Sequence, residues 1–352
     1  MDVEITVLIT AYNRKKYLSE AVRSVLNSTL DRTKYEIIVV KNFVDNEIDA
    51  FLARNNVVVI NTENVNIGKQ IAYGLYKAKG EIISFLDDDD MFEKEKLSLV
   101  LSEFTDLSLI YYHNLNSPIS EDSSKLKGNV QLPIQTELTL LPDTVESLTK
   151  ALSSRNDMTH YTLMFNLSCV SIRKEILLKQ KMSLESLIDG TDHFVFYISL
   201  MENRKMKFDT KYLTLYRVHE SASNMLSGEF NPKKIGPESI RLFLDPNHYS
   251  RVLDNLTRGS KVNRLVRCKL LEESILINIL SFNGQKYFTA KNFFEYQYCL
   301  KVNSKYTIKN FTIRFFFVSL ALTVPRLTGI GYLLYKYRNY NKRITFPSHR
   351  IQ

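Results

Sequence analysis

The sequence contains few cysteines, and these lie far apart. Only Cys169, Cys268 and Cys299 carry a thiol among 352 residues. Their spacing matches no zinc site, and three thiols do not form an even-numbered disulfide framework. Zinc-finger proteins and disulfide-rich secreted domains are therefore excluded, and we expect reduced thiols in a cytosolic setting.

The first residues lack the features of a secretory leader. They read MDVEITVLITAYN, in which no basic segment precedes a long apolar one, so no signal peptide is predicted. The hydrophobic content of 44% and the charged content of 24% are ordinary for a globular protein. The length allows two domains, or one domain with an appendage.

The net charge of +9 is unevenly distributed. Residues 251–352 contain 18 lysines and arginines against 4 acidic residues, which leaves 29 against 34 in the first 250 residues. Such a basic segment indicates an anionic partner, a membrane surface or a nucleic acid, although a solvated basic face has the same composition. We expect a catalytic domain over residues 1–225 and a helical, basic region over residues 226–352.

The N-terminal part alternates between apolar β-rich runs and helical patterns. Strands are predicted over residues 5–11, 35–40, 57–62 and 81–90, and helical patterns over residues 12–30, 46–56 and 68–80. This alternation predicts right-handed βαβ units and a parallel sheet. In such sheets, ligands bind beyond the carboxyl ends of the strands.

Four consecutive aspartates, Asp87–Asp90, end the fourth predicted strand in the segment FLDDDDMF. Mg²⁺ or Mn²⁺ prefers hard oxygen ligands of this kind, whereas an acidic turn that caps the next helix needs no ligand. The segment Thr10–Asn13 ends the first strand at the same predicted edge. This coincidence favours a functional site.

The middle of the chain is less regular. Residues 113–135 are polar and are predicted to form a loop or lid. Residues 167–177 are predicted to form a strand followed by a helix, and an apolar helix is predicted to begin near Asp192. Residues 212–224 are predicted to form a strand that leaves into a polar loop.

Four motifs in this order resemble those of the family 2 glycosyltransferases. They are Thr10–Asn13, the segment GEIISFLDDDD, Gly190–Asp192 and the segment YRVHESASN, and the resemblance covers residues 4–224. It implies a GT-A-type nucleotide-binding domain of class α/β with a mostly parallel central sheet. It also implies a metal-dependent, inverting enzyme that moves a sugar from a nucleotide-sugar donor to a hydroxyl of a glycan or a lipid-linked acceptor.

The resemblance also implies roles for single residues. Asp89 would bind the Mg²⁺ or Mn²⁺ that bridges the diphosphate, and His219 would face the metal or the diphosphate unless it is a hydrogen-bonded loop histidine. Asp192 would be the general base that deprotonates the acceptor hydroxyl, with Asp189 as the alternative. One of Asp88 and Asp90 is alternatively the cap of a helix near residue 93.

The remaining implied residues border the nucleotide sugar, with Asp87 by the ribose. They are Thr10, Ala11, Tyr12, Asn13, Asn42, Asn66, Gly68, Lys69, Asp87 and Asp88. Lys69 is equally compatible with an exposed surface position.

The sequence departs from the family at the end of the second strand. The family usually has Asp-Asp-Gly-Ser, and Lys41 and Asn42 stand here in place of the acids. The amide oxygen of Asn42 still accepts a hydrogen bond, so a uracil-like base stays compatible. The departure leaves open a degenerate nucleotide-sugar-binding or scaffold protein. A nucleotidyltransferase is the other alternative, but TAYNRKKYL lacks the glycines that its phosphate loop requires.

A stretch of 21 residues, Phe315–Tyr335, is largely apolar and long enough to span a bilayer. Arg326 in its middle costs about 2.5–3.5 kcal/mol on insertion, and basic residues flank both ends. We therefore expect peripheral attachment through residues 311–343 to the cytoplasmic face of a membrane, and no nucleic-acid partner. A packed core helix and a true span are the alternatives.

Overall fold

The computed structural model describes residues 2–63, 66–127, 136–141, 163–219, 245–280 and 294–295. The apolar stretch Phe315–Tyr335, Cys299 and the motif residues after His219 lie outside this part of the chain. The predicted domain boundary near residue 225 lies outside it as well.

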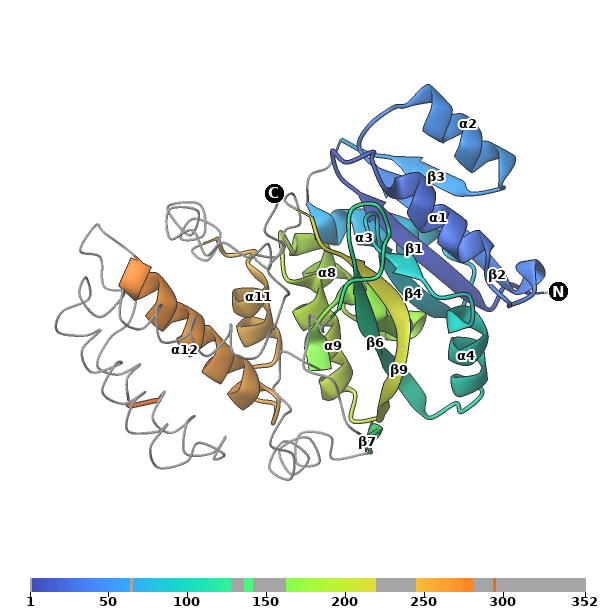
Figure 1. The fold of residues 1–352 in the computed structure, drawn as a ribbon. Helices are drawn as coiled ribbons and strands as arrows, with labels where there is room; N and C mark the ends of the chain where they lie inside the picture. Colours follow the sequence, from blue (N-terminus) through green and yellow to red (C-terminus); the bar gives the residue numbers. More distant parts are fainter. Residues whose placement is uncertain are drawn as a thin grey trace.

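The four predicted N-terminal strands are present and parallel. They are β1 (Ile5–Ala11), β2 (Tyr35–Lys41), β3 (Val58–Asn61) and β4 (Ile82–Asp87), in the spatial order β3-β2-β1-β4 (Figure 1). Neighbouring side chains of β1, such as Val7 and Leu8, enter two different apolar clusters. Because successive side chains of a strand point to opposite faces, a strand covered on both faces is apolar throughout.

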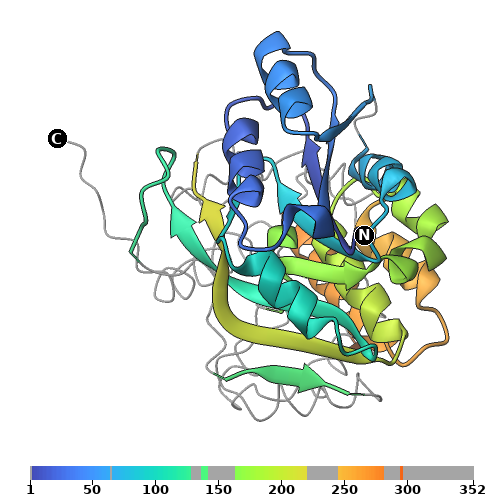
Figure 2. The ribbon, with the colours of Figure 1, turned by 90° about the vertical axis from the view of Figure 1, so that its right-hand side faces the viewer.

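Helices cover both faces of the sheet (Figure 2). The helices form two sets, and each set contributes side chains to the apolar cluster on one of the two faces. The first set is α1 (Leu18–Leu26), α2 (Asn46–Arg54) and α4 (Lys96–Glu103). The second set is α3 (Ile67–Lys77), α7 (Lys174–Lys179), α8 (Lys181–Ser186) and α9 (Thr191–Met201).

Later strands extend the sheet with mixed directions. They are β5 (Met91–Phe92), β6 (Leu109–Ile119), β7 (Leu138–Leu140), β8 (Val170–Arg173) and β9 (Lys205–Arg217). The order continues from β4 as β8-β6-β9-β5, and β7 also pairs with β9. β8 is antiparallel to both β4 and β6, whereas β6 and β9 are parallel. A 3₁₀ turn, Leu167–Cys169, leads into β8 and lies beneath the site described below.

The prediction of a loop from residue 113 is wrong for residues 113–119, which belong to β6. The polar side chains that suggested a loop are buried and have partners inside the protein. His113 Nε2 lies 2.8 Å from the Phe165 carbonyl oxygen, and Asn114 Nδ2 donates to Thr214 Oγ1 over 2.9 Å. Polarity indicates solvent only where such internal partners are absent.

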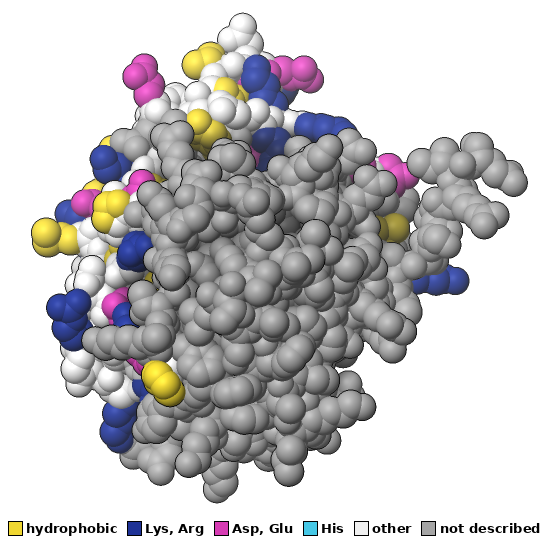
Figure 3. All heavy atoms as spheres, turned by 90° about the vertical axis from the view of Figure 1, so that its left-hand side faces the viewer, with side chains coloured by type: hydrophobic (Ala, Val, Ile, Leu, Met, Phe, Trp, Pro, Cys, Tyr) yellow, Lys and Arg dark blue, Asp and Glu magenta, His cyan; other side chains and the backbone are white. Residues whose placement is uncertain are grey.

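The described part of the C-terminal region contains α11 (Tyr249–Leu256) and α12 (Asn263–Leu280). Tyr249, Leu253 and Val266 belong to the same apolar cluster as α9. Within the described residues, no helix combines the length and the apolar character that crossing a membrane requires. On the face of the molecule drawn in Figure 3, lysine and arginine side chains lie interspersed with acidic ones where described residues reach the surface.

Two of the cysteines can be compared with the expectation of reduced thiols. Cys169 is a buried free thiol, as expected. Cys268 is disulfide-bonded, so the expectation is wrong for this residue. Separation along the sequence does not prevent two cysteines from meeting in space, which is why spacing alone failed here.

Candidate active site

Three sequence segments meet at the carboxyl edge of the parallel strands. Thr10 of β1 lies beside Asp87 of β4, and Ala11 lies beside Lys41 of β2. The sheet therefore brings together the segment Thr10–Asn13, the aspartate run and the position where the sequence departs from the family.

The aspartates form a tight turn after β4, and we call Asp87–Asp90 the acidic turn. Asp88, Asp89 and Asp90 are 2%, 9% and 1% exposed. Burial raises the pKa of Asp88 to about 6 and, together with the Asp89 charge, that of Asp90 to about 7. Burial and the three neighbouring carboxylates hold the pKa of Asp87 well above its usual range.

Carboxylate oxygens of Asp87, Asp89 and Asp90 all lie within 4.8 Å of one another. Three hard oxygen donors this close match the preference of Mg²⁺ or Mn²⁺. The residues present therefore fit the predicted cation. Asp90, for which the sequence allowed a helix cap as an alternative, belongs to this group of carboxylates.

Asp90 is held from below by residues that follow much later in the chain. Its carboxylate accepts hydrogen bonds from Asn166 Nδ2 over 2.7 Å and from the Arg217 backbone amide over 3.0 Å. Ser168 Oγ accepts from the Asp87 amide over 3.0 Å. The alternative of a helix cap is wrong for Asp88 and Asp90, because α4 begins at Lys96 after Glu95.

Arg14 and His219 both contact the acidic turn through their side chains. The Arg14 guanidinium contacts both oxygens of Asp88, and its Nη1 lies 2.8 Å from Asp89 Oδ2. His219 Nε2 lies 2.8 Å from the same Oδ2, and its ring lies against Tyr17 with centroids 5.2 Å apart. His219 is therefore hydrogen-bonded beside Asp89.

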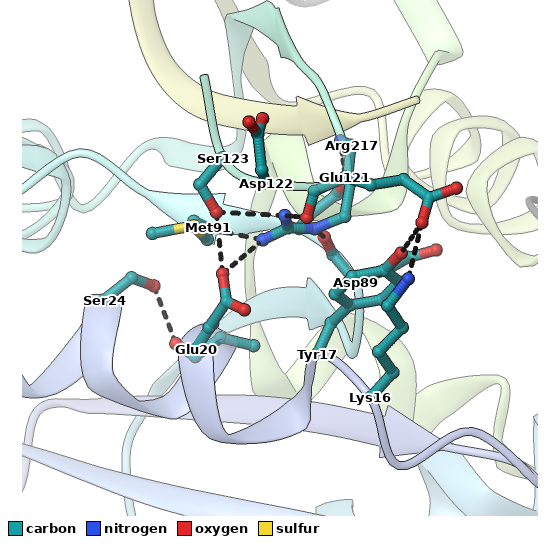
Figure 4. Close-up of polar contacts among 12 residues, drawn as sticks. Lys16, Tyr17, Glu20, Ser24, Asp89, Met91, Glu121, Asp122, Ser123 and Arg217 are labelled. Atoms are coloured by element: carbon teal, nitrogen blue, oxygen red, sulfur yellow. Dashed lines mark hydrogen bonds and ion pairs between the residues drawn. The ribbon is translucent and has the colours of Figure 1, made fainter. Parts of the chain in front are cut away.

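Arg217 is a buried arginine that connects the acidic turn to two other segments (Figure 4). Its Nε donates to the Asp89 carbonyl over 2.8 Å, and its Nη2 lies 2.9 Å from Glu20 Oε2 of α1. The guanidinium also lies over the Tyr17 ring, 4.4 Å from its centroid. Its Nη1 donates to the turn after β6, at the carbonyls of Ser120 and Glu121 and the hydroxyl of Ser123.

The departure at the end of β2 is compensated inside the protein. Lys41 is fully buried, and its Nζ lies 2.9 Å from Asp49 Oδ1 and 2.9 Å from Asn61 Oδ1. Asn42 pairs with Asn13 instead, since Asn42 Oδ1 accepts from the Asn13 amide over 2.7 Å and Asn42 Nδ2 donates to Asn13 Oδ1 over 2.8 Å. Tyr12 beside them is 43% exposed.

The predicted residues at the start of α3 have visible structural roles. Asn66 is the N-cap, and its Oδ1 accepts from the Lys69 amide over 3.3 Å. A Cβ on Gly68 would lie 1.8 Å from the Leu184 carbonyl oxygen, so only glycine allows α3 to approach α8 this closely.

Asp192 lies in the first turn of α9, after a glycine in a left-handed conformation. Gly190 has a φ of 60°, and a Cβ there would lie 2.1 Å from the Tyr249 ring. Asp192 Oδ1 accepts from the His193 amide over 2.8 Å and lies 2.9 Å from His193 Nδ1. Burial raises and His193 lowers the pKa of Asp192, and the contacts with His193 prevail, so this pKa lies below its usual range.

Asp189, the alternative base, contacts the start of α11 instead. Its Oδ1 accepts from the Tyr249 amide over 3.1 Å, and its Oδ2 lies 3.2 Å from His248 Nε2. The Tyr249 ring lies between the His193 and His248 rings, at centroid distances of 4.6 Å and 4.7 Å. Two Asp–His pairs therefore flank one tyrosine where α9 and α11 meet.

The sequence motifs did not identify Arg14, Asn166 or Ser168 as residues of the site. Arg217 lies within the motif YRVHESASN, but no role was predicted for it. Arg14 directly follows the Thr10–Asn13 motif, which was a usable signal. Asn166 and Ser168 carried no signal, because nothing in the sequence around them indicates that they lie beneath the acidic turn.

A cation-compatible carboxylate cluster thus lies at the carboxyl edge of the parallel strands, where α/β sheets commonly bind their ligands. Residues 6–166 match the family described as glycosyl transferase family 2. These residues make up less than half of the chain, and for this part, which carries the first two motifs, the match confirms the predicted resemblance.

Two curated relatives illustrate the similarity. An uncharacterized glycosyltransferase of Rickettsia conorii is 24% identical over 260 residues, which cover 73% of this chain and 37% of the relative. The poly(ribitol-phosphate) beta-N-acetylglucosaminyltransferase TarS of Staphylococcus aureus is 27% identical over 101 residues, 27% of this chain and 18% of TarS. The matches thus span well under half of these relatives.

The crystal structure of S. aureus TarS 1–349 in complex with UDP-GlcNAc has a similar fold. The TM-score is 0.58 at 15% sequence identity, over 99% of this chain and 98% of that one. At this low identity the comparison concerns the fold alone. The similarity of the two folds confirms the predicted GT-A architecture.

Proposed function

We propose that this chain is a metal-dependent, inverting glycosyltransferase that uses a nucleotide-sugar donor. The observation that carries the proposal is the group of Asp87, Asp89 and Asp90, whose oxygens lie within 4.8 Å of one another at the carboxyl end of β4. A bound Mg²⁺ or Mn²⁺ would neutralise the charge that develops on the departing diphosphate.

The donor side is assigned to the edge formed by β1, β2 and β4. Asp89 and His219 are proposed to hold the cation, with Asp90 as an additional ligand, and Asp87 lies by the ribose. Thr10 to Asn13 flank the nucleoside, and the oxygen of Asn42 has a second lone pair available for the base. Asp88, Asn66, Gly68 and Lys69 complete the proposed border of the donor.

The base that takes the proton of the acceptor hydroxyl is proposed to be Asp192. Its contacts with His193 keep its carboxylate ionised, and its side chain is 24% exposed. Displacement of water by the acceptor would raise its pKa toward that of a useful base. Asp189 is less suited, because both of its oxygens already contact the start of α11.

UDP-GlcNAc is the first donor to test, because a structural neighbour was crystallised with it. The acceptor is proposed to be a glycan or lipid-linked hydroxyl. A screen of nucleotide sugars should find one that is hydrolysed slowly with Mn²⁺ and not after chelation. Calorimetry that finds no metal-dependent binding of any nucleotide sugar would favour the degenerate scaffold over the enzyme.

The basic region after residue 225 is proposed to attach the protein peripherally to the cytoplasmic face of a membrane. The motivation is the sequence Phe315–Tyr335 with basic residues on both sides. Deletion of residues 311–352 should release the protein from anionic liposomes in a co-sedimentation assay. Unchanged sedimentation would contradict the attachment and favour a packed helix.

A further inference from the structure

The acidic turn has an exchangeable cation built into the chain, and that cation is Arg14. We propose that Arg14 is the counter-ion of the metal-free site, that it leaves Asp89 when the divalent cation binds, and that it then binds the donor diphosphate. This inference rests on the proposed function for the identity of its final partner. It assigns to Arg14, one position after the Thr10–Asn13 motif, a role as a donor-binding residue.

Competition for a single oxygen atom is the first argument. Asp89 Oδ2 lies 2.8 Å from Arg14 Nη1 and 2.8 Å from His219 Nε2. A carboxylate oxygen offers about two lone-pair sites, so two donors occupy this atom fully. A cation that approaches Asp89 through Oδ2 must therefore replace one of them.

Differences in burial and anchoring indicate which donor leaves. The His219 side chain is 1% exposed and lies against the Tyr17 ring. His219 also follows the buried Arg217 by only two residues. The Arg14 side chain is 26% exposed and lies on a segment after β1 outside any helix or strand. Arg14 therefore has room to move, whereas moving His219 would disturb several packed segments.

The chemistry of the guanidinium indicates where Arg14 goes. Arginine binds carboxylate and phosphate through the same planar fork. Arg14 directly follows Asn13, which ends the segment proposed to flank the nucleoside. A diphosphate bound at this edge of the sheet would therefore lie close to the Arg14 guanidinium. Exchange of one anionic partner for another also keeps the guanidinium paired throughout.

The adjacent lysines offer matched controls, because they are bound elsewhere. Lys15 lies 3.2 Å from Asp45, and Lys16 pairs with Glu121. Lys15→Gln removes the same charge one position away from Arg14 without touching the acidic turn.

Arginine-selective labelling with phenylglyoxal, read by mass spectrometry, tests the exchange directly. Arg14 should react faster with Mn²⁺ than without metal, and it should become protected when UDP is added with Mn²⁺. Arg204, which pairs with Glu175 near the surface, should react equally in all three states. A rate at Arg14 that Mn²⁺ leaves unchanged or lowers would overturn the exchange.

Calorimetry of the Arg14→Gln variant should give changes of opposite sign. Mn²⁺ alone should bind roughly threefold to tenfold more tightly, because no internal cation has to be displaced. UDP in the presence of Mn²⁺ should bind roughly tenfold to a hundredfold more weakly, because a charged hydrogen-bond donor is lost. Lys15→Gln should change neither affinity.

Arg14→Lys guards against a variant that does not fold, because it keeps the charge beside Asp88. A single ammonium does not span Asp88 and Asp89, so both affinities should shift in the same directions by smaller factors. Loss of both affinities in Arg14→Lys would overturn the proposal and indicate a purely structural role. Absence of Mn²⁺ binding already in the wild-type protein would overturn the proposed function together with the exchange.

Discussion

The acidic turn and the turn before α9 carry the two halves of the proposed reaction, and they are held in different ways. The acidic turn is fixed by side chains of opposite charge and by hydrogen bonds from Asn166, Arg217 and His219. Asp192 is fixed by a left-handed glycine, its neighbour His193 and the ring of Tyr249.

Because the two regions are held in different ways, they should tolerate different kinds of substitution. Carboxylates packed together require compensating charge, because their mutual repulsion grows as water is excluded. A single carboxylate at the N-terminus of a helix is already stabilised by the backbone amides. Donor binding should therefore respond to changes of charge around the acidic turn, whereas the position of the Asp192 carboxylate should respond to changes of shape at Gly190 and Tyr249.

The largest effect is expected from Asp89→Ala. This substitution should abolish metal-dependent binding of the nucleotide sugar, a loss greater than the roughly 10- to 100-fold that a supporting residue costs. Calorimetry with Mn²⁺ provides the measurement, and Asp106→Ala at a more exposed Lys205 pair is the control. Near-normal turnover of Asp89→Ala with Mn²⁺ would remove Asp89 from the proposed cation site.

Asp192→Asn keeps the shape of the side chain and removes its basicity. Transfer should fall by roughly 10²–10⁴, which is the usual contribution of a general base, while affinity for the nucleotide sugar stays unchanged. Steady-state kinetics compared with Asp189→Asn separates the two candidates. If only Asp189→Asn loses transfer, the role belongs to Asp189, and if neither does, the inverting mechanism is wrong.

Arg217→Ala tests whether one buried cation stabilises the donor side. Removal takes away the hydrogen bonds of Arg217 to the Asp89 and Glu121 carbonyls and its ion pair with Glu20, and it should lower the free energy of unfolding by about 3–5 kcal/mol. Arg204→Ala, at a more exposed ion pair, should cost less than about 1 kcal/mol. Denaturant unfolding measures both, and similar losses would show that Arg217 has no special weight.

Stability should depend on pH with opposite signs in the two regions. The pKa of Asp88 is raised to about 6 and that of Asp90 to about 7, so the folded metal-free protein binds protons that the unfolded chain has lost. This contribution is complete below about pH 4 and disappears as the pH rises through 6 to 7. The pKa of Asp192 is lowered, so its contribution is present above about pH 4 and is lost in stronger acid.

Thermal unfolding without metal between pH 4 and 7 measures this dependence. Burial lowers the pKa of Lys96 to about 7, so Lys96 adds a rising trend only above that window. Burial lowers the pKa of His113 to about 4, so His113 adds a rising trend between about pH 4 and 6.5 that opposes the contribution of the aspartates. Asp90→Asn should therefore make stability rise more steeply with pH than in the wild-type protein, and an unchanged slope would contradict the raised pKa of Asp90.

The sequence predicted the N-terminal strands and helices well, because each is determined by a local pattern. The runs that became β1, β2 and β4 are apolar on both faces, and Asn66 and Asp45 cap the following helices as expected for their residue types. The motif order also located the acidic turn at the correct edge of the sheet.

The contacts that complete the site were not predictable from local patterns. Arg217 meets Glu20 across 197 positions of the sequence, and Lys41 meets Asn61 across 20. A buried charge is recognisable only once its partners are placed beside it. The same reason explains the wrong loop at residues 113–119, whose polar side chains find partners inside the protein.

The order of synthesis gives the acidic turn a further consequence. Its partners Asn166 and His219 follow Asp90 and Asp89 by 76 and 130 positions. Arg14 is made before the aspartates, but at about 5–20 residues per second the four aspartates leave the ribosome several seconds before Asn166 and His219. β8, which lies between β4 and β6, is also made after both, so long-range pairing should limit the folding rate. Chains stalled after residue 127 should therefore remain sensitive to protease around the turn, and protection at that length would show that the first strands fold alone.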